Sequence, residues 1–300
     1  MLSVAVAAPG AGRGQPAALS VNQIAPGIFV HDGVQEDASA ANADAIANIG
    51  FIIGTNSVAV IDPGGSEREG MALRAAIRAR TGLPIRYVIM THAHPDHIFG
   101  AAAFRADHPD FVGHEKLPAA LAARGAYYLH RLHETIGDAA NGSEIVPPTV
   151  LVAGRIELDL GGRRLAVAAH GPAHSDCDLT VFDDRTQTLW LADLLFVGRI
   201  PAIDGSLQGW LGELRRVTAT AAARAVPGHG PASVSWPQAA APEHRYLEAV
   251  LRDTRAALKA GIDIADAYRR VAQSERGHWL LFDDYHARNV TRSYKELEWE

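Results

Sequence analysis

The chain has 300 residues, of which 48% are hydrophobic, and can therefore bury a sizeable core as one large domain or two small ones. Its formal net charge is −6 and its basic residues are dispersed, which excludes the basic footprint of a nucleic-acid-binding protein. The only cysteine, Cys177, excludes an internal disulfide and an all-cysteine zinc site. No apolar run approaches the eighteen residues of a transmembrane helix.

The N-terminus has two interpretations. Residues 2–8 form a short apolar run with Ala5-Val6-Ala7 as a small-residue cleavage pattern, although no basic residue precedes it. Residues 1–24 are therefore expected to be a signal-peptide remnant or an arm rich in Ala, Gly and Pro. The first interpretation predicts a mature start between about residues 9 and 21, which N-terminal sequencing of protein from its own host would test.

The first half of the chain predicts short strands, with turns at Gly, Asn and Asp, alternating with helices. Ser66 followed by Glu69 is a capping-box pattern, and Leu73, Ala76 and Ile77 give the helix after it an apolar face. The expected elements are strands at 28–31, 50–54 and 58–61, a helix at 67–80, a strand at 86–90, a helix from near 97, a strand at 111–112 and a helix at 115–137.

Pro147-Pro148 predicts a break, after which the second half repeats the rhythm of strands followed by helices. Gly161-Gly162 is a hairpin signal between its first two strands. This order predicts an α+β sandwich with sheets inside and helices outside. The expected elements are strands at 156–160, 164–169, 179–182 and 188–191, helices at 211–223 and 241–260, a short helix from about 263 and a last helix within 279–300.

The stretch from Thr91 to His97, THAHPDH, places three imidazoles and a carboxylate within six residues, directly after the apolar strand. His92, His94 and Asp96 are spaced by two and point to one side of an extended segment. His97 breaks this rhythm and is expected to point towards a second centre. The pattern favours a metal site over a His-rich surface turn.

Three further candidate ligands follow strands in the second half. His174 lies in GPAHS, Asp193 follows the apolar residues Trp190 to Ala192, and His229 stands between two glycines that permit a close backbone approach. Each alone is typical of a turn or a surface position. Their order and contexts together make them candidate ligands.

The order HxHxDH, GPAHS, ADLLF and PGHG resembles the metallo-β-lactamase superfamily over about residues 28–231. The resemblance implies a four-layer αβ/βα sandwich with two metals at the edge of the paired sheets. Residues 25–300 would then form one such domain, with a C-terminal helical extension from about residue 237. It also implies that His92, His94 and His174 hold the first metal, that Asp96, His97 and His229 hold the second, that Asp193 bridges them, and that Asp62 braces the His loop.

The resemblance can be narrowed. An aspartate at 193, where the β-lactamases proper place Cys or Ser, is closer to a glyoxalase II-like arrangement. Residues 48–51, 98–100 and 282–290 resemble zinc metallohydrolases associated with bacterial quinoprotein and sulfur-oxidation systems. Because those proteins are often exported, this narrower resemblance favours a periplasmic or secreted protein over a cytoplasmic one, with a quinoprotein-system component as an implied partner.

Other polar residues have a weaker case. His130 and His133 lie one helical turn apart without a nearby carboxylate, which favours a solvated helix face. Cys177 and Asp178 border the GPAHS loop, the first as an inert thiol and the second as a residue that orients the loop. Residues 115–137 and the tail are expected to wall the pocket, where Tyr285, His286 and Arg288 either select an anionic substrate or close the core.

Five His and two Asp without a thiolate suit zinc, although iron or manganese accepts the same donors. Two cations lower the pKa of a shared water from about 15.7 to about 7. We therefore expect a binuclear zinc hydrolase, with Asp96 and Asp193 as its catalytic carboxylates, in which a metal-bridging hydroxide attacks the ester, thioester, lactone or lactam carbonyl of a small molecule. Two alternatives stay open: an iron-dependent enzyme of the persulfide oxygenase type, and a metal-bearing accessory module of a quinoprotein pathway.

Overall fold

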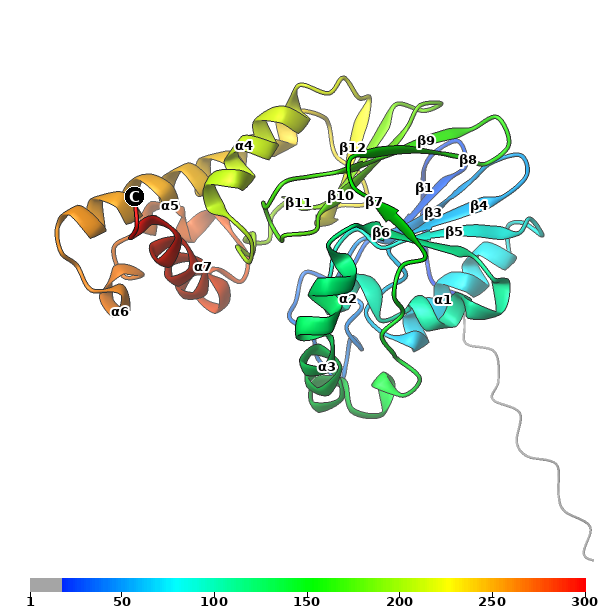
Figure 1. Ribbon diagram of the computed structural model, residues 1–300, viewed down its shortest axis with the longest axis horizontal. Coiled ribbons are helices and arrows are strands. Elements are labelled where there is room, and N and C mark those ends of the chain that lie inside the picture. Colours follow the sequence, from blue (N-terminus) through cyan, green and yellow to red (C-terminus); the bar gives the residue numbers. More distant parts are fainter. Residues whose placement is uncertain (1–17) are drawn as a thin grey trace, which may run out of the picture.

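The computed structural model describes residues 18–300, as two β-sheets with helices around them (Figure 1). The α+β fold predicted from the sequence is confirmed. Residues 2–8, with the cleavage pattern, lie outside the described residues, so the signal-peptide interpretation stays a prediction. Within residues 18–300, no helix combines the length and the apolar character that crossing a membrane requires.

The first sheet has seven strands in sequential order, antiparallel from β1 to β4 and parallel from β4 to β7. Pairing of β7 with β6 corrects the expected break at Pro147-Pro148, because the first sheet takes one more strand after the prolines. The strands are β1 (Asn22–Ala25), β2 (Ile28–His31), β3 (Ile49–Ile53), β4 (Val58–Ile61), β5 (Ile85–Ile89), β6 (Asp110–His114) and β7 (Val150–Val152).

The second sheet has five strands in the order β12-β11-β10-β9-β8, with only the β11–β12 pair parallel. One prediction was wrong here, because β11 was expected to end at Leu191 but continues to Phe196 and is buried throughout. The strand expected before His229, for which no bounds were predicted, is formed by residues 224–229 and includes His229 itself. The strands are β8 (Arg155–Asp159), β9 (Arg164–Ala169), β10 (Leu179–Asp183), β11 (Thr188–Phe196) and β12 (Arg224–His229).

The helices follow the predicted order with shifted ends. Ser66 caps α1 by accepting from the Glu69 backbone N–H at 3.3 Å, but the Glu69 carboxylate accepts from Gly65, one residue before the capping-box position. α2, expected from near His97, begins two residues earlier at Pro95, where a proline is tolerated in the first turn. The helices are α1 (Glu67–Arg78), α2 (Pro95–Ile98), α3 (Leu117–Ile136), α4 (Leu207–Thr218), α5 (Ala241–Lys259), α6 (Ile264–Ala267) and α7 (Phe282–Leu297), with 3₁₀ turns η1 (Ala101–Asp107), η2 (Gly137–Ala140), η3 (Gln238–Ala240) and η4 (Gln273–His278).

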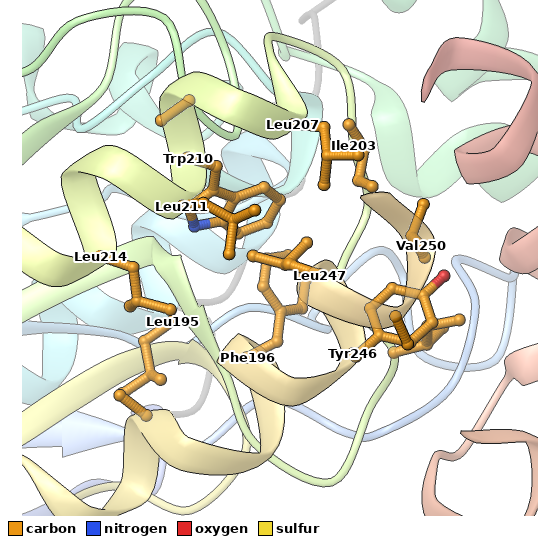
Figure 2. Close-up of a cluster of buried hydrophobic side chains, with 14 of the residues drawn as sticks. Leu195, Phe196, Ile203, Leu207, Trp210, Leu211, Leu214, Tyr246, Leu247 and Val250 are labelled. Carbon is orange, nitrogen blue, oxygen red and sulfur yellow. The ribbon is translucent and has the colours of Figure 1, made fainter. Parts of the chain in front are cut away.

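The helix expected at 211–223 corresponds to α4, which begins and ends earlier. Ser206 sets its start, because its hydroxyl accepts from the Gly209 N–H at 2.9 Å. Its apolar residues are Leu207, Trp210, Leu211 and Leu214 (Figure 2), and these pack on Leu195 and Phe196 of β11 and on Tyr246, Leu247 and Val250 of α5.

The C-terminal helices α5, α6 and α7 lie together at one end of the molecule (Figure 1). Asn289 of α7 fixes the loop between β11 and α4, because its amide donates to the Pro201 carbonyl at 2.7 Å and accepts from the Ile203 N–H at 2.9 Å. This loop contributes side chains to the site described next.

Candidate metal centre

The first group of converging side chains consists of His92 and His94 after β5, His174 after β9 and Asp193 in β11. His94 Nδ1 lies 3.1 Å from His92 Nε2 and 2.8 Å from His174 Nε2. Asp193 Oδ2 lies 3.7 Å from His92 Nε2 and 3.2 Å from His174 Nε2. Three imidazoles and a carboxylate therefore surround one point.

The second group consists of Asp96 and His97 on α2 and His229 at the end of β12. His229 Nε2 is 3.3 Å from Asp96 Oδ2, and His97 Nε2 is 3.6 Å from the same oxygen. Asp193 reaches this group as well, with Oδ1 3.1 Å from His97 Nε2 and Oδ2 3.5 Å from His229 Nε2. All seven sequence-predicted residues are thus brought together, and Asp193 touches both groups.

Asp193 is aimed by an irregularity inside β11. The sequence predicted that the strand ends before Asp193, but the strand continues. Its pairing with β12 shifts between Ala192 and Phe196, and Ala192 has a φ of 46°. Such irregularities re-aim the following side chain. The opposite residue must be Gly228, because a Cβ at that position would lie 1.9 Å from Asp193 Oδ1.

Backbone carbonyls fix the ring protons of two histidines. His174 Nδ1 lies 2.8 Å from the Ala202 carbonyl, and His229 Nδ1 lies 2.9 Å from the Ile46 carbonyl. Because a carbonyl oxygen can only accept, both rings donate through Nδ1. In its neutral form each ring therefore presents an unprotonated Nε2 to the centre.

Asp62 organises two more rings from below the loop. It accepts from the Thr91 backbone N–H, the Thr91 hydroxyl and His97 Nδ1, each at 2.8 Å. Because the Thr91 hydroxyl donates its proton to Asp62, its oxygen accepts a hydrogen bond from His92 Nδ1 at 3.1 Å. Neutral His92 and His97 therefore also turn a bare Nε2 inward, which is the bracing role that the resemblance implied for Asp62.

His94 is held by Asp204, a residue that the sequence analysis missed. Asp204 Oδ2 accepts from His94 Nε2 at 3.2 Å, so His94 is the one ring that turns Nδ1 inward. Asp204 lies in the loop before α4, and no motif marks it. The only local signal was an aspartate before a glycine, which is typical of an ordinary turn.

The inner atoms fit a cation. Unprotonated nitrogens at 2.8 and 3.1 Å from one another, as His94 lies from His174 and His92, repel unless a positive charge lies between them. His97 Nε2 and Asp193 Oδ1 are buried and lack a hydrogen-bond partner among the described residues, a state that normally costs stability. Imidazole and carboxylate donors without thiolate suit a divalent metal such as zinc.

The two groups hold protons differently. Burial lowers the pKa of His92 well below its usual value and lowers that of His174 to about 4. Burial also opposes protonation of His97, but the carboxylates of Asp193 and Asp96 outweigh it and raise the pKa of His97 well above its usual value. His92 and His174 of the first group are therefore neutral, whereas His97 of the second attracts a proton.

We predict that acidification releases metal from the second group first. The pKa of His229, like that of His97, is raised by Asp193 despite burial, so a metal must displace protons from both rings. A fall in pH favours those protons and weakens metal binding, whereas His174 meets this competition only near its pKa of about 4. Zinc titrations at about pH 5.5 and about pH 8 should lose one site selectively at the lower pH. Equal weakening of both sites would contradict the assignment.

The other residues singled out in the sequence lie outside the two groups. His130 is exposed and pairs with Glu134 at 3.3 Å, away from the centre, as expected of a solvated helix face. Cys177 is buried, which raises the pKa of its thiol to about 12 and leaves it inert. Asp178 accepts from the backbone N–H and the hydroxyl of Ser175 at 2.9 and 2.5 Å, and so orients the loop that carries His174.

A cavity of about 220 Å³ opens onto both groups. Its walls include Tyr128 of α3 and Tyr285 and Arg288 of α7, the two segments predicted to wall the pocket. His286 instead faces the interior and bonds to Tyr246, so the tail both closes the core and borders the site. A larger cavity of about 630 Å³ lies between α4 and the second sheet, but none of the seven candidate ligands lines it.

A family model described as the metallo-β-lactamase superfamily matches residues 43–229, which include all seven converging side chains. The chain belongs to the metallo-β-lactamase superfamily. Members with such a site are generally metal-dependent hydrolases, and this superfamily member is assigned to that class.

Solved structures share the fold. A metallo-β-lactamase from Pontibacter korlensis is 18% identical with a TM-score of 0.62, over 77% of this chain and 99% of that chain. TMB-1 is 17% identical with a TM-score of 0.59, over 77% and 97%. A metallo-β-lactamase from Erythrobacter litoralis is 16% identical with a TM-score of 0.59, over 78% and 97%. The comparison with curated proteins found no match.

Proposed function

We propose that this superfamily member is a binuclear zinc hydrolase of small ester, thioester, lactone or lactam substrates. The observation that carries the proposal is the position of Asp193, whose two oxygens lie within 3.1 to 3.7 Å of four imidazoles drawn from both groups. A carboxylate shared in this way suits a pair of cations better than a single one.

When bound, two divalent cations would supply the Lewis acidity that lowers the pKa of a water to about 7. His92, His94 and His174 would hold the first, Asp96, His97 and His229 the second, and Asp193 both. The side chains also keep ring protons outward, because each imidazole donates its N–H to a fixed acceptor. The donor atoms are thus oriented before substrate arrives.

Water is the nucleophile that the pocket favours. None of the described residues that line the cavity is a serine, threonine, cysteine or lysine, the side chains that most often form acyl-enzymes. Asp96 lines the cavity and is partly exposed, so its carboxylate can accept a proton from an attacking water and return it to the leaving group.

Three finer assignments belong to the same proposal. Asp193 in place of Cys or Ser supports a glyoxalase II-like arrangement, and the segments 48–51, 98–100 and 282–290 support a relation to quinoprotein-associated metallohydrolases. That relation is also what supports export to the periplasm and a quinoprotein-system partner. Co-purification from the periplasmic fraction of the host would test both, and a purely cytosolic location would remove them.

The metal content tests the proposal directly. Protein purified without added metal should contain about two zinc ions per chain by mass spectrometry, because two donor groups adjoin. His174→Ala should abolish binding at the first group and His229→Ala at the second, each leaving about one metal. The exposed His130→Ala, outside both groups, is the matched control and should keep two.

Two outcomes would contradict the proposal. A full pair of metals in His174→Ala would show that this ring is not a ligand. One iron per chain, with oxygen consumption in the presence of a persulfide and no hydrolysis of thioester probes by the zinc-loaded protein, would replace hydrolysis by oxygenase chemistry.

A further inference from the structure

Arginines border the cavity over the metal groups, and they differ in how strongly they are already engaged. Arg199 is buried and held in place: it donates to the Glu36 carbonyl at 3.1 Å and to the Tyr285 hydroxyl at 2.9 Å. Tyr285 in turn donates to Asp37. Both terminal nitrogens of Arg199 therefore already donate within the protein.

Asp204, which also lines the cavity, stands between Arg124 of α3 and Arg288 of α7. Arg124 donates to Asp204 Oδ2, the same oxygen that accepts from His94, and its guanidinium lies 5.3 Å from the Tyr128 ring centroid. Arg124 therefore neutralises the charge of Asp204.

Arg288 is the least engaged of the three arginines. Its nearest charge is Asp204 Oδ1 at 3.6 Å, it makes no hydrogen bond within residues 18–300, and its side chain is 60% exposed. It lines the same cavity as His94 and Asp96. Asp204 carries one negative charge, and Arg124 and Arg288 carry two positive charges, so this cluster has a net positive charge. The donors of the Arg288 guanidinium fork remain free among the described residues.

We propose that Arg288 binds a carboxylate carried by the substrate, so that the preferred substrates are small acyl compounds with a second, anionic end. Arg124 positions the subsite by neutralising Asp204. The geometry favours a carboxylate, because the guanidinium fork of Arg288, which makes no hydrogen bond within residues 18–300, matches that group in two directions. The cavity of about 220 Å³ limits the substrate to a small molecule. The inference rests on the proposed function for its reaction, but not for its binding step.

The test compares two thioesters that differ only at the far end: S-phenyl butanethioate, which ends in a methyl group, and the mono-S-phenyl thioester of succinic acid, which ends in a carboxylate. Wild-type protein loaded with zinc should favour the succinyl probe by about tenfold or more in kcat/KM, mainly through KM, since a remote contact binds substrate and transition state alike. Arg288→Gln should bring the ratio to about one, and Arg288→Glu below one. Lys295→Gln, an exposed change on the same helix, should leave the ratio unchanged.

Calorimetry keeps this inference separate from the hydrolase proposal. Butyrate and succinate each offer one carboxylate to the metals, and only succinate has a second for Arg288. Succinate should bind about tenfold more tightly than butyrate, and Arg288→Gln should remove the difference. If neither thioester is hydrolysed but this difference is found, the reaction is wrong and the subsite stands. Equal binding of the two acids, or a preference for succinate that survives Arg288→Gln, would overturn the subsite.

Discussion

Replacing Asp193 by asparagine is expected to lower hydrolysis of thioester probes by more than about 100-fold, beyond the loss typical of removing an outer partner of a metal ligand. Asparagine keeps the shape but removes the negative charge that faces His92, His97, His174 and His229. The side chain is only 4% exposed, so water cannot replace that charge. Both metals should therefore bind more weakly, which metal titration of the variant measures.

Asp184→Asn provides the matched control for this experiment. Asp184 lies just beyond β10, is 60% exposed, and meets Arg164 only at 3.7 Å, so its charge is screened by solvent. We expect unchanged metal content and unchanged turnover. If Asp193→Asn behaves like this control, Asp193 is a structural residue of β11 and does not bridge two metals.

The metal groups were predictable because their residues stand in short local patterns. His92, His94 and Asp96 alternate after a buried strand and were expected on one side. His92 and His94 do converge, but Asp96 lies on α2 and joins His97 in the second group. His97 was expected to point elsewhere, and it does so because a helical turn starts at Pro95 and rotates the chain. A proline that begins a helix and restricts the residue before it carries this information in the sequence itself.

Asp204 could not be predicted by the same route. Its partner His94 lies 110 residues away in the sequence. The loop that carries Asp204, between β11 and α4, is fixed by Asn289, near the end of the chain. Nothing within a window of a few residues distinguishes such an aspartate from a turn former. Likewise β7 pairs with β6 across a whole helix, so the prolines before it gave a misleading boundary.

The tail shows a third limit. Substrate selection and core closure were open alternatives for Tyr285, His286 and Arg288, and neighbouring positions of α7 divide between them. Tyr285 and Arg288, three residues apart, share the face of α7 towards the cavity. His286 is buried instead and hydrogen-bonds to the Tyr246 hydroxyl and the Val271 carbonyl. Helical spacing implied this division, but its direction depended on how α7 docks.

Trp210→Ala is expected to destabilise the protein by about 3–5 kcal/mol, the usual cost of removing a buried aromatic side chain. Trp210 is fully buried in the cluster of α4, β11 and α5 (Figure 2), and its indole N–H donates to the Leu194 carbonyl at 3.3 Å. Urea unfolding with a chelator measures this loss without the contribution of bound metal. Trp299→Ala, at a position 86% exposed, should change stability by less than about 0.5 kcal/mol.

The same substitution should weaken one metal group more than the other. The Trp210 ring packs edge-on against His174, with centroids 5.3 Å apart, whereas His229 stacks on Phe196 at 5.0 Å. A cavity at Trp210 therefore removes the direct support of a first-group ring, whereas it reaches the second group only indirectly, through Phe196, against which Trp210 also packs. Zinc titration of folded Trp210→Ala should show lower affinity at the first group. Unfolding at wild-type urea concentrations, or equal weakening of both sites, would mean that this cluster does not hold His174 in place.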